Sequence, residues 1–267
     1  SLAADTPGVG QIVLVCDKPK ADSKQAIDLA VTTAAAVVLA RDWVNTPAND
    51  LYPESFAEAA RTVARNAKLT VDVWDEKALE REGFGALMAV GGGSSRKPRL
   101  VKVGYAPRGA KFHLALVGKG ITFDTGGLNL KPADGMYTMK ADMAGAASVL
   151  AATAAIAQLG LKIRVTAWAA LAENLPSGTA YRPSDVLHIY GGKTVEELYD
   201  PNVDPSRVYY GTDTRAQALL IGVALAFALL SAALLWIPSR WPATAPLAWI
   251  VTAPLVLACR RSAGGRA

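Results

Sequence analysis

Four charged side chains follow one apolar strand in the middle of the chain, and their types and spacing suit chemistry. The strand is predicted over residues 111–117, and the charged residues come after it in loop or element-end positions: Lys119, Asp124, Lys131 and Asp142. In an open α/β sheet, ligands bind in the crevice beyond the carboxyl ends of the strands. These four residues are therefore the first candidates for a functional site.

Two carboxylates plus an amine that converge on one crevice suit a divalent cation. Carboxylate oxygen and nitrogen donors bind Mn²⁺ and Zn²⁺, although a lysine ligates only as the neutral amine because the ammonium form has no acceptor. A carboxylate shared by two ions would make a two-metal site, which acidifies a bridging water and polarises a carbonyl for amide hydrolysis. Glycines 118, 120, 126 and 127 are expected to take positive φ and turn the chain around the ions.

Two other interpretations of this stretch have to be weighed. Glycine-rich turns after strands often only connect elements, in which case Lys119 and Lys131 would be solvated surface charges. A phosphate cradle is the second alternative, but the GxxxxGK[ST] pattern is absent because Gly120 follows Lys119. Spacing alone leaves the first alternative open and sets the second aside.

Residues 117–150 (VGKGITFDTGGLNLKPADGMYTMKADMAGAASVL) resemble the metal-binding signature of the M17 leucyl aminopeptidases, also called cytosol aminopeptidases. The resemblance extends over residues 22–198, through ARDWVNTPAND (40–50), YPESFAEAAR (52–61), AVGGGSSRKPRLVKVGY (89–105) and ALAENLPSGTAYRPSDVLHIYGGKTVE (170–196). It implies a metal-dependent hydrolase that removes amino-terminal residues from peptides. A cytoplasmic location and assembly into homo-hexamers are also implied.

The resemblance also implies a role for each site residue. Lys119 and Asp142 would lie on the tighter of two divalent metal sites, for Mn²⁺ or Zn²⁺, and Asp124 would bridge both ions. Lys131 would be catalytic, polarising the scissile carbonyl and its oxyanion, and Met139 would line the substrate pocket. Thr125 and Ala144 stand where the family frequently has serine and glycine.

The family pattern stops after Leu198. In the family the next strand leads into Asn-Thr-Asp-Ala-Glu-Gly-Arg, whose acids complete the metal sites and whose arginine holds a bicarbonate base. Here residues 199–204 read YDPNVD instead, so the metal site is incomplete. Because a lost donor or base typically costs on the order of 10² to 10⁴ in rate, we predict little or no peptidase activity for this chain alone.

The order of the predicted elements indicates an α/β fold, a partial helix-flanked mixed sheet. Residues 1–22, with a strand at 11–16, would be a remnant of an amino-terminal domain, and 23–198 a partial catalytic domain. Ser23 is the expected N-cap of the first helix, and Gly191-Gly192 the turn of a hairpin. The sequence predicts helices over 23–44, 53–67, 76–81 and 145–159 and strands over 69–74, 100–105, 111–117 and 163–171.

Three further residues near this region need an interpretation. Glu173 ends an apolar strand at the same edge, and is either a catalytic carboxylate or a solvated loop charge. His113 and His188 lack HExxH spacing, so both are interpreted as structural.

Residues 199–267 belong to a different physical class. An uncharged run over 216–239 and a weaker one over 241–259 predict a two-helix transmembrane hairpin, so the chain would meet a membrane through residues 216–259. Two buried core helices are the alternative. This tail also resembles part of the acyltransferase-3 membrane family, so a membrane acyltransferase fragment or a non-functional chimeric reading frame are the alternative functions.

Composition excludes some classes of function. The net charge of +5 falls mostly in the tail, and so the pI of 9.2 indicates no nucleic-acid face. The two cysteines, Cys16 and Cys259, imply no disulfide framework. No signal peptide is evident at the first residues, and the peptidase part is expected in the cytoplasm.

Overall fold

The computed structural model describes residues 13, 15 and 22–196. Most of the predicted remnant at 1–22, including most of its strand, and the whole tail over 199–267 lie outside the described residues. The transmembrane hairpin therefore stays a prediction from sequence.

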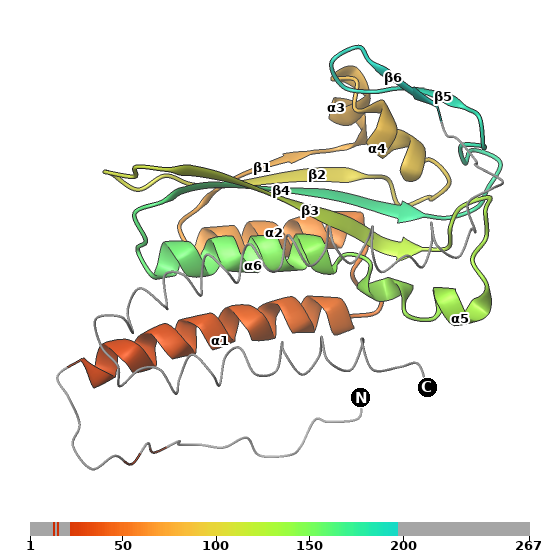
Figure 1. Cartoon of the computed structure of the whole chain (residues 1–267). Coiled ribbons are helices and arrows are strands. Elements are labelled where there is room, and N and C mark those ends of the chain that lie inside the picture. The colour runs from red at the N-terminus through yellow and green to blue at the C-terminus, as the bar shows by residue number, and fades with distance from the viewer. Residues whose placement is uncertain (1–12, 14, 16–21, 197–267) are drawn as a thin grey trace, which may run out of the picture.

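A four-stranded mixed sheet forms the centre of the described fold (Figure 1). The strand order is β1-β2-β4-β3, where β2 is antiparallel to both β1 and β4, and β3 runs parallel to β4. The predicted mixed sheet is confirmed. Its strands are β1 (Thr70–Trp74), β2 (Arg99–Tyr105), β3 (His113–Asp124) and β4 (Arg164–Asn174).

Helices cover the sheet on both sides (Figure 1). One face carries α2 (Pro53–Asn66) and α6 (Ala144–Gln158), and α1 (Ser23–Asn45) packs against α6 from outside. On the other side lie α3 (Glu76–Arg81), α4 (Gly85–Val90) and the hairpin of β5 (Val186–His188) and β6 (Thr194–Glu196). The crossover from β3 to α6 contains α5 (Ala133–Met136) and the 3₁₀ helix η1 (Met139–Ala141).

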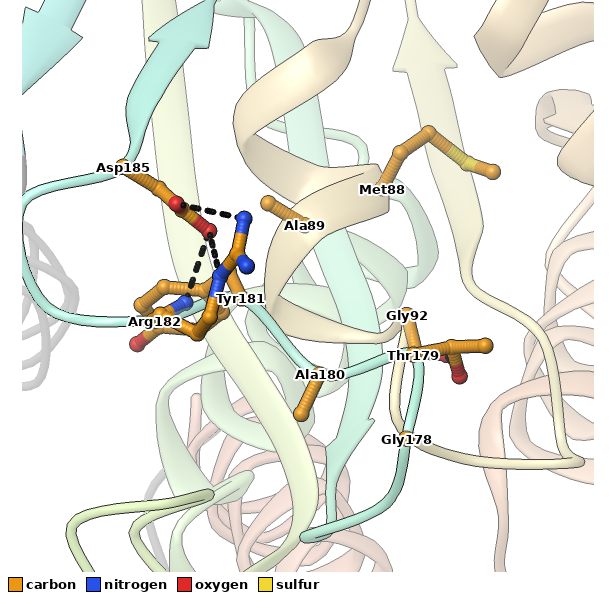
Figure 2. Close-up of a pocket in the computed structure, with 9 residues that line it drawn as sticks. All are labelled: Met88, Ala89, Gly92, Gly178, Thr179, Ala180, Tyr181, Arg182 and Asp185. Atoms are coloured by element: carbon orange, nitrogen blue, oxygen red, sulfur yellow. Dashed lines mark hydrogen bonds and ion pairs between the residues drawn. The ribbon is translucent and has the colours of Figure 1, made fainter.

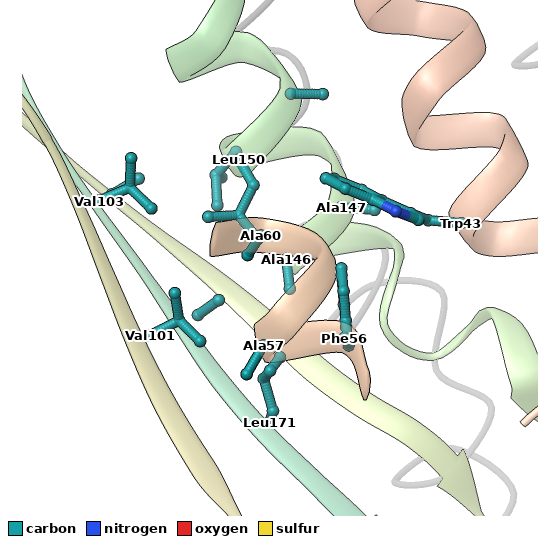
Figure 3. Packing of buried hydrophobic residues seen from close by; sticks show 14 of the residues in the cluster. Trp43, Phe56, Ala57, Ala60, Val101, Val103, Ala146, Ala147, Leu150 and Leu171 are labelled. Carbon is teal, nitrogen blue, oxygen red and sulfur yellow. The ribbon is translucent and has the colours of Figure 1, made fainter. Parts of the chain in front are cut away.

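The core lies between the sheet and the helices α2 and α6 (Figure 3). Phe56 of α2 is fully buried and meets Trp43 of α1 edge-on, with ring centroids 5.2 Å apart. The residues of α6 that face this core are mostly alanines, so that helix packs close to the strands. Burial of these apolar faces is the main stabilising term for the arrangement.

The predicted helix positions agree with the structure to within one residue, but the N-cap and the end of β3 differ. Asp22, and not Ser23, occupies the N-cap of α1. The predicted turn at Gly118 and Gly120 is wrong, because β3 continues to Asp124. Of the four glycines expected at positive φ, only 126 and 127 adopt it. Short elements such as α4, α5 and η1 carry too little periodicity to be predicted.

Gly118 is needed for close packing and not for a turn. A Cβ at this position would lie 2.6 Å from Cα of Ala146, inside helix α6. Glycine thus lets the beginning of α6 rest directly on β3. The strand that carries Lys119 and the helix that follows Asp142 are held together by this contact.

One helical stretch of the described residues, 133–158, is long and apolar enough to resemble a membrane span. Of the 18 residues that form its apolar part, 56% are buried inside the fold. Its apolar character is therefore explained by its position in the core.

We predict that Gly118→Ala lowers the free energy of unfolding by about 1 to 3 kcal/mol, because α6 must move away from β3. Urea denaturation of the full chain measures the change. Gly178→Ala is the matched control: a Cβ there meets no described atom within 4 Å, and φ is not positive. Its expected change is within about 0.5 kcal/mol, and equal effects of the two substitutions would contradict the packing argument.

Candidate metal centre

The parallel pairing of β3 and β4 brings Asp124 and Asn174 together at the carboxyl edge of the sheet. The two residues are register partners at the ends of their strands. Beyond them, the backbone N–H and the hydroxyl of Thr125 both donate to the carbonyl oxygen of Asn174, at 3.0 and 2.8 Å. This edge is therefore closed by hydrogen bonds and holds Asp124 in a fixed place.

The loop after Asp124 folds back so that Lys131 reaches the same carboxylate. Gly126 and Gly127 have φ of +90° and +68°, which glycine adopts readily, and the backbone N–H of Lys131 donates to the carbonyl of Thr125 at 2.8 Å. The amine of Lys131 then lies 2.9 Å from Oδ2 of Asp124. Their side chains are 3% and 7% exposed, so the interpretation of Lys131 as a solvated charge is wrong.

Burial and neighbouring charges act in opposite directions on the pKa of Asp124. Desolvation alone would raise this pKa, but the hydrogen bond and charge of Lys131 lower it, helped by the Gly126 N–H and the charge of Lys119. The net result is a pKa below the ordinary value of 3.8. The carboxylate is therefore ionised at neutral pH.

Lys119 and Asp142 form a second acid and amine pair beside the first. Nζ of Lys119 lies 2.5 Å from Oδ2 of Asp142. Lys119 projects from within β3 and not from a loop as predicted, while Asp142 follows η1 directly. Because Lys119 also lowers the pKa of Asp124, the four predicted residues act on one another. Met139 lies on η1, three residues before Asp142, and is half-buried.

Glu173 takes part in a separate buried network. Its Oε2 accepts a hydrogen bond from the Ser94 hydroxyl at 2.5 Å, and Arg96 lies 3.9 Å from Oε1. Arg96 also donates to the carbonyl of Ala48 and stacks over the ring of Tyr52. With 6% exposure, Glu173 is no solvated loop charge. It ties the end of β4 to two loops.

The two histidines make no contact that suggests a metal site. His113 is exposed on β3, and its Nε2 lies 2.9 Å from the Thr166 hydroxyl on β4. His188 is exposed on β5, in the hairpin whose turn contains Gly191 and Gly192 at positive φ.

A hollow of about 430 Å³ lies between α4 and the segment 178–185 (Figure 2). Arg182 and Asp185 pair across its rim at 3.1 Å, and the Arg182 backbone N–H helps to lower the pKa of Asp185. Its described lining includes none of the four acids and amines. The acid and amine cluster therefore remains the candidate site.

The donors present fit a divalent cation in part. The carboxylates of Asp124 and Asp142 and the amine of Lys119 are brought together. Each carboxylate is paired with a lysine amine. A bound cation would supply the positive charge that these amines supply here. Across residues 22–196, however, no group of three or more His, Cys, Asp or Glu side chains is placed to hold a metal. The cluster thus provides part of a ligand set.

Sequence reasoning missed the side chain of Asn174. Its Nδ2 donates to Oδ1 of Asp124 at 2.9 Å, and the residue is 8% exposed. The available signal was its position, since a polar residue at the end of an apolar strand faces the site edge. Only the parallel register with β3 reveals its partner.

Comparison with protein families matches residues 38–198 to the catalytic domain of the cytosol aminopeptidase family, M17. A probable cytosol aminopeptidase of Cutibacterium acnes is 55% identical over 194 residues, which cover 72% of this chain and 38% of that protein. One from Leifsonia xyli is 60% identical over 169 residues, or 63% and 34% of the two chains. This chain thus spans well under half the length of these relatives.

Solved structures show the same similarity. The bottromycin maturation enzyme BotP in complex with Mn is 44% identical with a TM-score of 0.63, covering 66% of this chain and 38% of that one. The cytosol aminopeptidase of Coxiella burnetii is 38% identical with a TM-score of 0.61, covering 64% and 37%. The family match ends at residue 198, so the resemblance of the tail to acyltransferase-3 stays a prediction.

We predict that Asp124→Asn destabilises the metal-free chain at pH 6, by about 3 to 5 kcal/mol, because Lys131 is left buried without its counter-charge. The pKa of Asp124 is lower in the folded chain than in the unfolded chain, where it is about 3.9. The stability that the ionised carboxylate contributes is therefore fully present above the unfolded pKa, and it is lost as the pH falls through the folded pKa. The difference in the free energy of unfolding between wild type and Asp124→Asn should therefore become smaller below about pH 4.

Urea denaturation at pH 6 and pH 3, with a chelator present, measures this difference in the free energy of unfolding at each pH. Asp185→Asn is the control, since that pKa is also lowered but its side chain, 29% exposed, is partly screened by solvent. A constant gap for Asp124→Asn across this pH range would contradict the role given to the buried pair.

Proposed function

Because this chain belongs to the cytosol aminopeptidase family, M17, we propose that its described residues form the metal-binding part of an aminopeptidase catalytic domain. The reaction is hydrolysis of the amino-terminal peptide bond of a peptide. The observation that carries the proposal is the convergence of Lys119, Asp124, Lys131 and Asp142 at the carboxyl edge of β3. Asp124, Lys131 and Asp142 are buried or half-buried, and Lys119, whose side chain is 39% exposed, pairs with Asp142 at the same edge.

Lys119, Asp124 and Asp142 are the residues that would hold divalent metal. Mn²⁺ is the first candidate because a structural neighbour is a complex with Mn, and Zn²⁺ accepts the same donors. A bound dication supplies Lewis acidity and an acidified water. The carboxylate of Asp124 is suited to this role, since it is ionised and held by three donors: Gly126, Lys131 and Asn174.

Lys131 is the proposed catalytic amine. Its loop backbone is fixed by the bond to Thr125, so the ammonium group is presented at the site edge with little freedom. A fixed positive charge stabilises negative charge that develops on a carbonyl oxygen during hydrolysis. Met139 is proposed to contact the first side chain of the substrate, from its position on η1 beside the crossover to Asp142.

We further propose that this chain hydrolyses peptides poorly by itself. The described donors number three, and the family segment that would add acids and an arginine does not follow Glu196. The 23–198 part is proposed to lie in the cytoplasm and to associate as homo-hexamers, as its family does.

Metal binding by the full chain is the first test. We expect Mn²⁺ binding in isothermal titration calorimetry, and loss of it in the double variant Asp124→Ala, Asp142→Ala, because both carboxylates are removed. The matched control is Asp28→Ala, Asp72→Ala, since these acids are 62% and 59% exposed. Equal Mn²⁺ affinity in the two double variants would refute the proposed site.

Turnover of a leucyl amide with added Mn²⁺ or Zn²⁺ is the second test. We expect a rate at least about 10²-fold below that of a complete M17 enzyme, because several ligands and the base are absent. Any residual turnover should fall further in Lys131→Ala, which removes the proposed catalytic amine. A rate equal to that of a complete family enzyme would show that the described donors suffice.

A further inference from the structure

The side-chain amide of Asn174 is a neutral group that donates a hydrogen bond to the carboxylate of Asp124. Nδ2 donates to Oδ1 at 2.9 Å, and both residues are at least nine-tenths buried. Oδ1 also accepts from the Gly126 N–H at 2.9 Å, whereas Lys131 donates to Oδ2. The two carboxylate oxygens are thus held by different kinds of donor.

We propose that Asn174 is a positioning residue of the metal centre, whose amide fixes the rotation of the Asp124 carboxylate and so the direction in which it meets a cation. This inference rests on the proposed function, because it concerns the same carboxylate. Residues that hydrogen-bond to a metal ligand without touching the metal orient that ligand, and their loss typically weakens metal binding by about 10- to 100-fold.

The orientation of the amide follows from its surroundings. An ionised carboxylate only accepts hydrogen bonds, so the NH₂ group and not the amide oxygen must face Asp124. The amide oxygen points toward Gly127, where an added Cβ would lie 2.9 Å away. Gly127, with its positive φ, therefore leaves the space in which the amide of Asn174 lies.

The backbone at residue 174 is held independently of its side chain. Two hydrogen bonds from Thr125 reach the Asn174 carbonyl oxygen, and the preceding residue, Glu173, is anchored to Ser94. A substitution at 174 thus removes the amide while leaving these bonds in place. Its effect on metal binding can be separated from an effect on the fold.

The test compares full-length wild type with Asn174→Ala, which lacks the amide, and Asn174→Leu, which also lacks it but keeps a similar volume. Titration calorimetry gives the Mn²⁺ affinity, and visible absorption of the Co²⁺-loaded chain reports the ligand geometry. We expect about tenfold or greater weakening of Mn²⁺ binding in both variants and altered Co²⁺ bands. If Asn174→Ala does not fold, Asn174→Leu decides.

Thr153→Ala is the control for a merely structural role. Thr153 is fully buried in α6, and its hydroxyl donates to the carbonyl of Val149. It lies about 14 Å along the helix from Ala144, the first residue of α6. This variant should lose thermal stability yet keep wild-type Mn²⁺ affinity and Co²⁺ bands.

Two results would overturn the inference, and they are distinguishable. Wild-type affinity and bands in a folded position-174 variant would show that the amide only stabilises the fold, while leaving the proposed metal site intact. No Mn²⁺ binding by wild type, or equal binding by Asp124→Ala, would refute the metal site and the inference with it.

Discussion

The ion pair between Lys131 and Asp124 is the constraint on which the site depends. Both side chains are almost completely removed from water, and an isolated charge in such a place is costly unless it is paired and hydrogen-bonded. The loop between them must therefore fold back, which requires the positive φ of Gly126 and Gly127. The N–H of Gly126 and the amide of Asn174 also donate to this carboxylate, and Gly126 adds to the lowering of its pKa by Lys131.

The packing of α6 on β3 provides the second half of the site. Because Gly118 has no side chain, the helix rests on the strand at Ala146. Asp142, two residues before the first residue of α6, thereby comes beside Lys119. Parallel pairing with β4 then supplies Asn174 and Glu173 at the same edge. A rigid core, and not the loops alone, thus positions the charges.

Much of this arrangement could be predicted from the sequence, for identifiable reasons. Long apolar or periodic segments such as residues 53–67 gave correct helices, and the spacing of the acids and lysines indicated one crevice. Gly118 was misinterpreted because a glycine that permits close packing and one that permits a turn look the same in a sequence. Asn174 and Glu173 could not be assigned, since their partners, Asp124 and Ser94, are distant in the chain. Strand register brings Asp124 to Asn174, and the loop before β2 brings Ser94 to Glu173.

The central claim is that a cation replaces the charge balance now provided by the two acid and amine pairs. A crystal structure of the full chain grown with Mn²⁺, with anomalous scattering data to locate the ion, tests it most directly. We expect an anomalous peak within bonding distance of Asp124 and Asp142, with Lys119 turned from its ion pair toward the metal. A peak elsewhere, or none while both ion pairs persist, would contradict it.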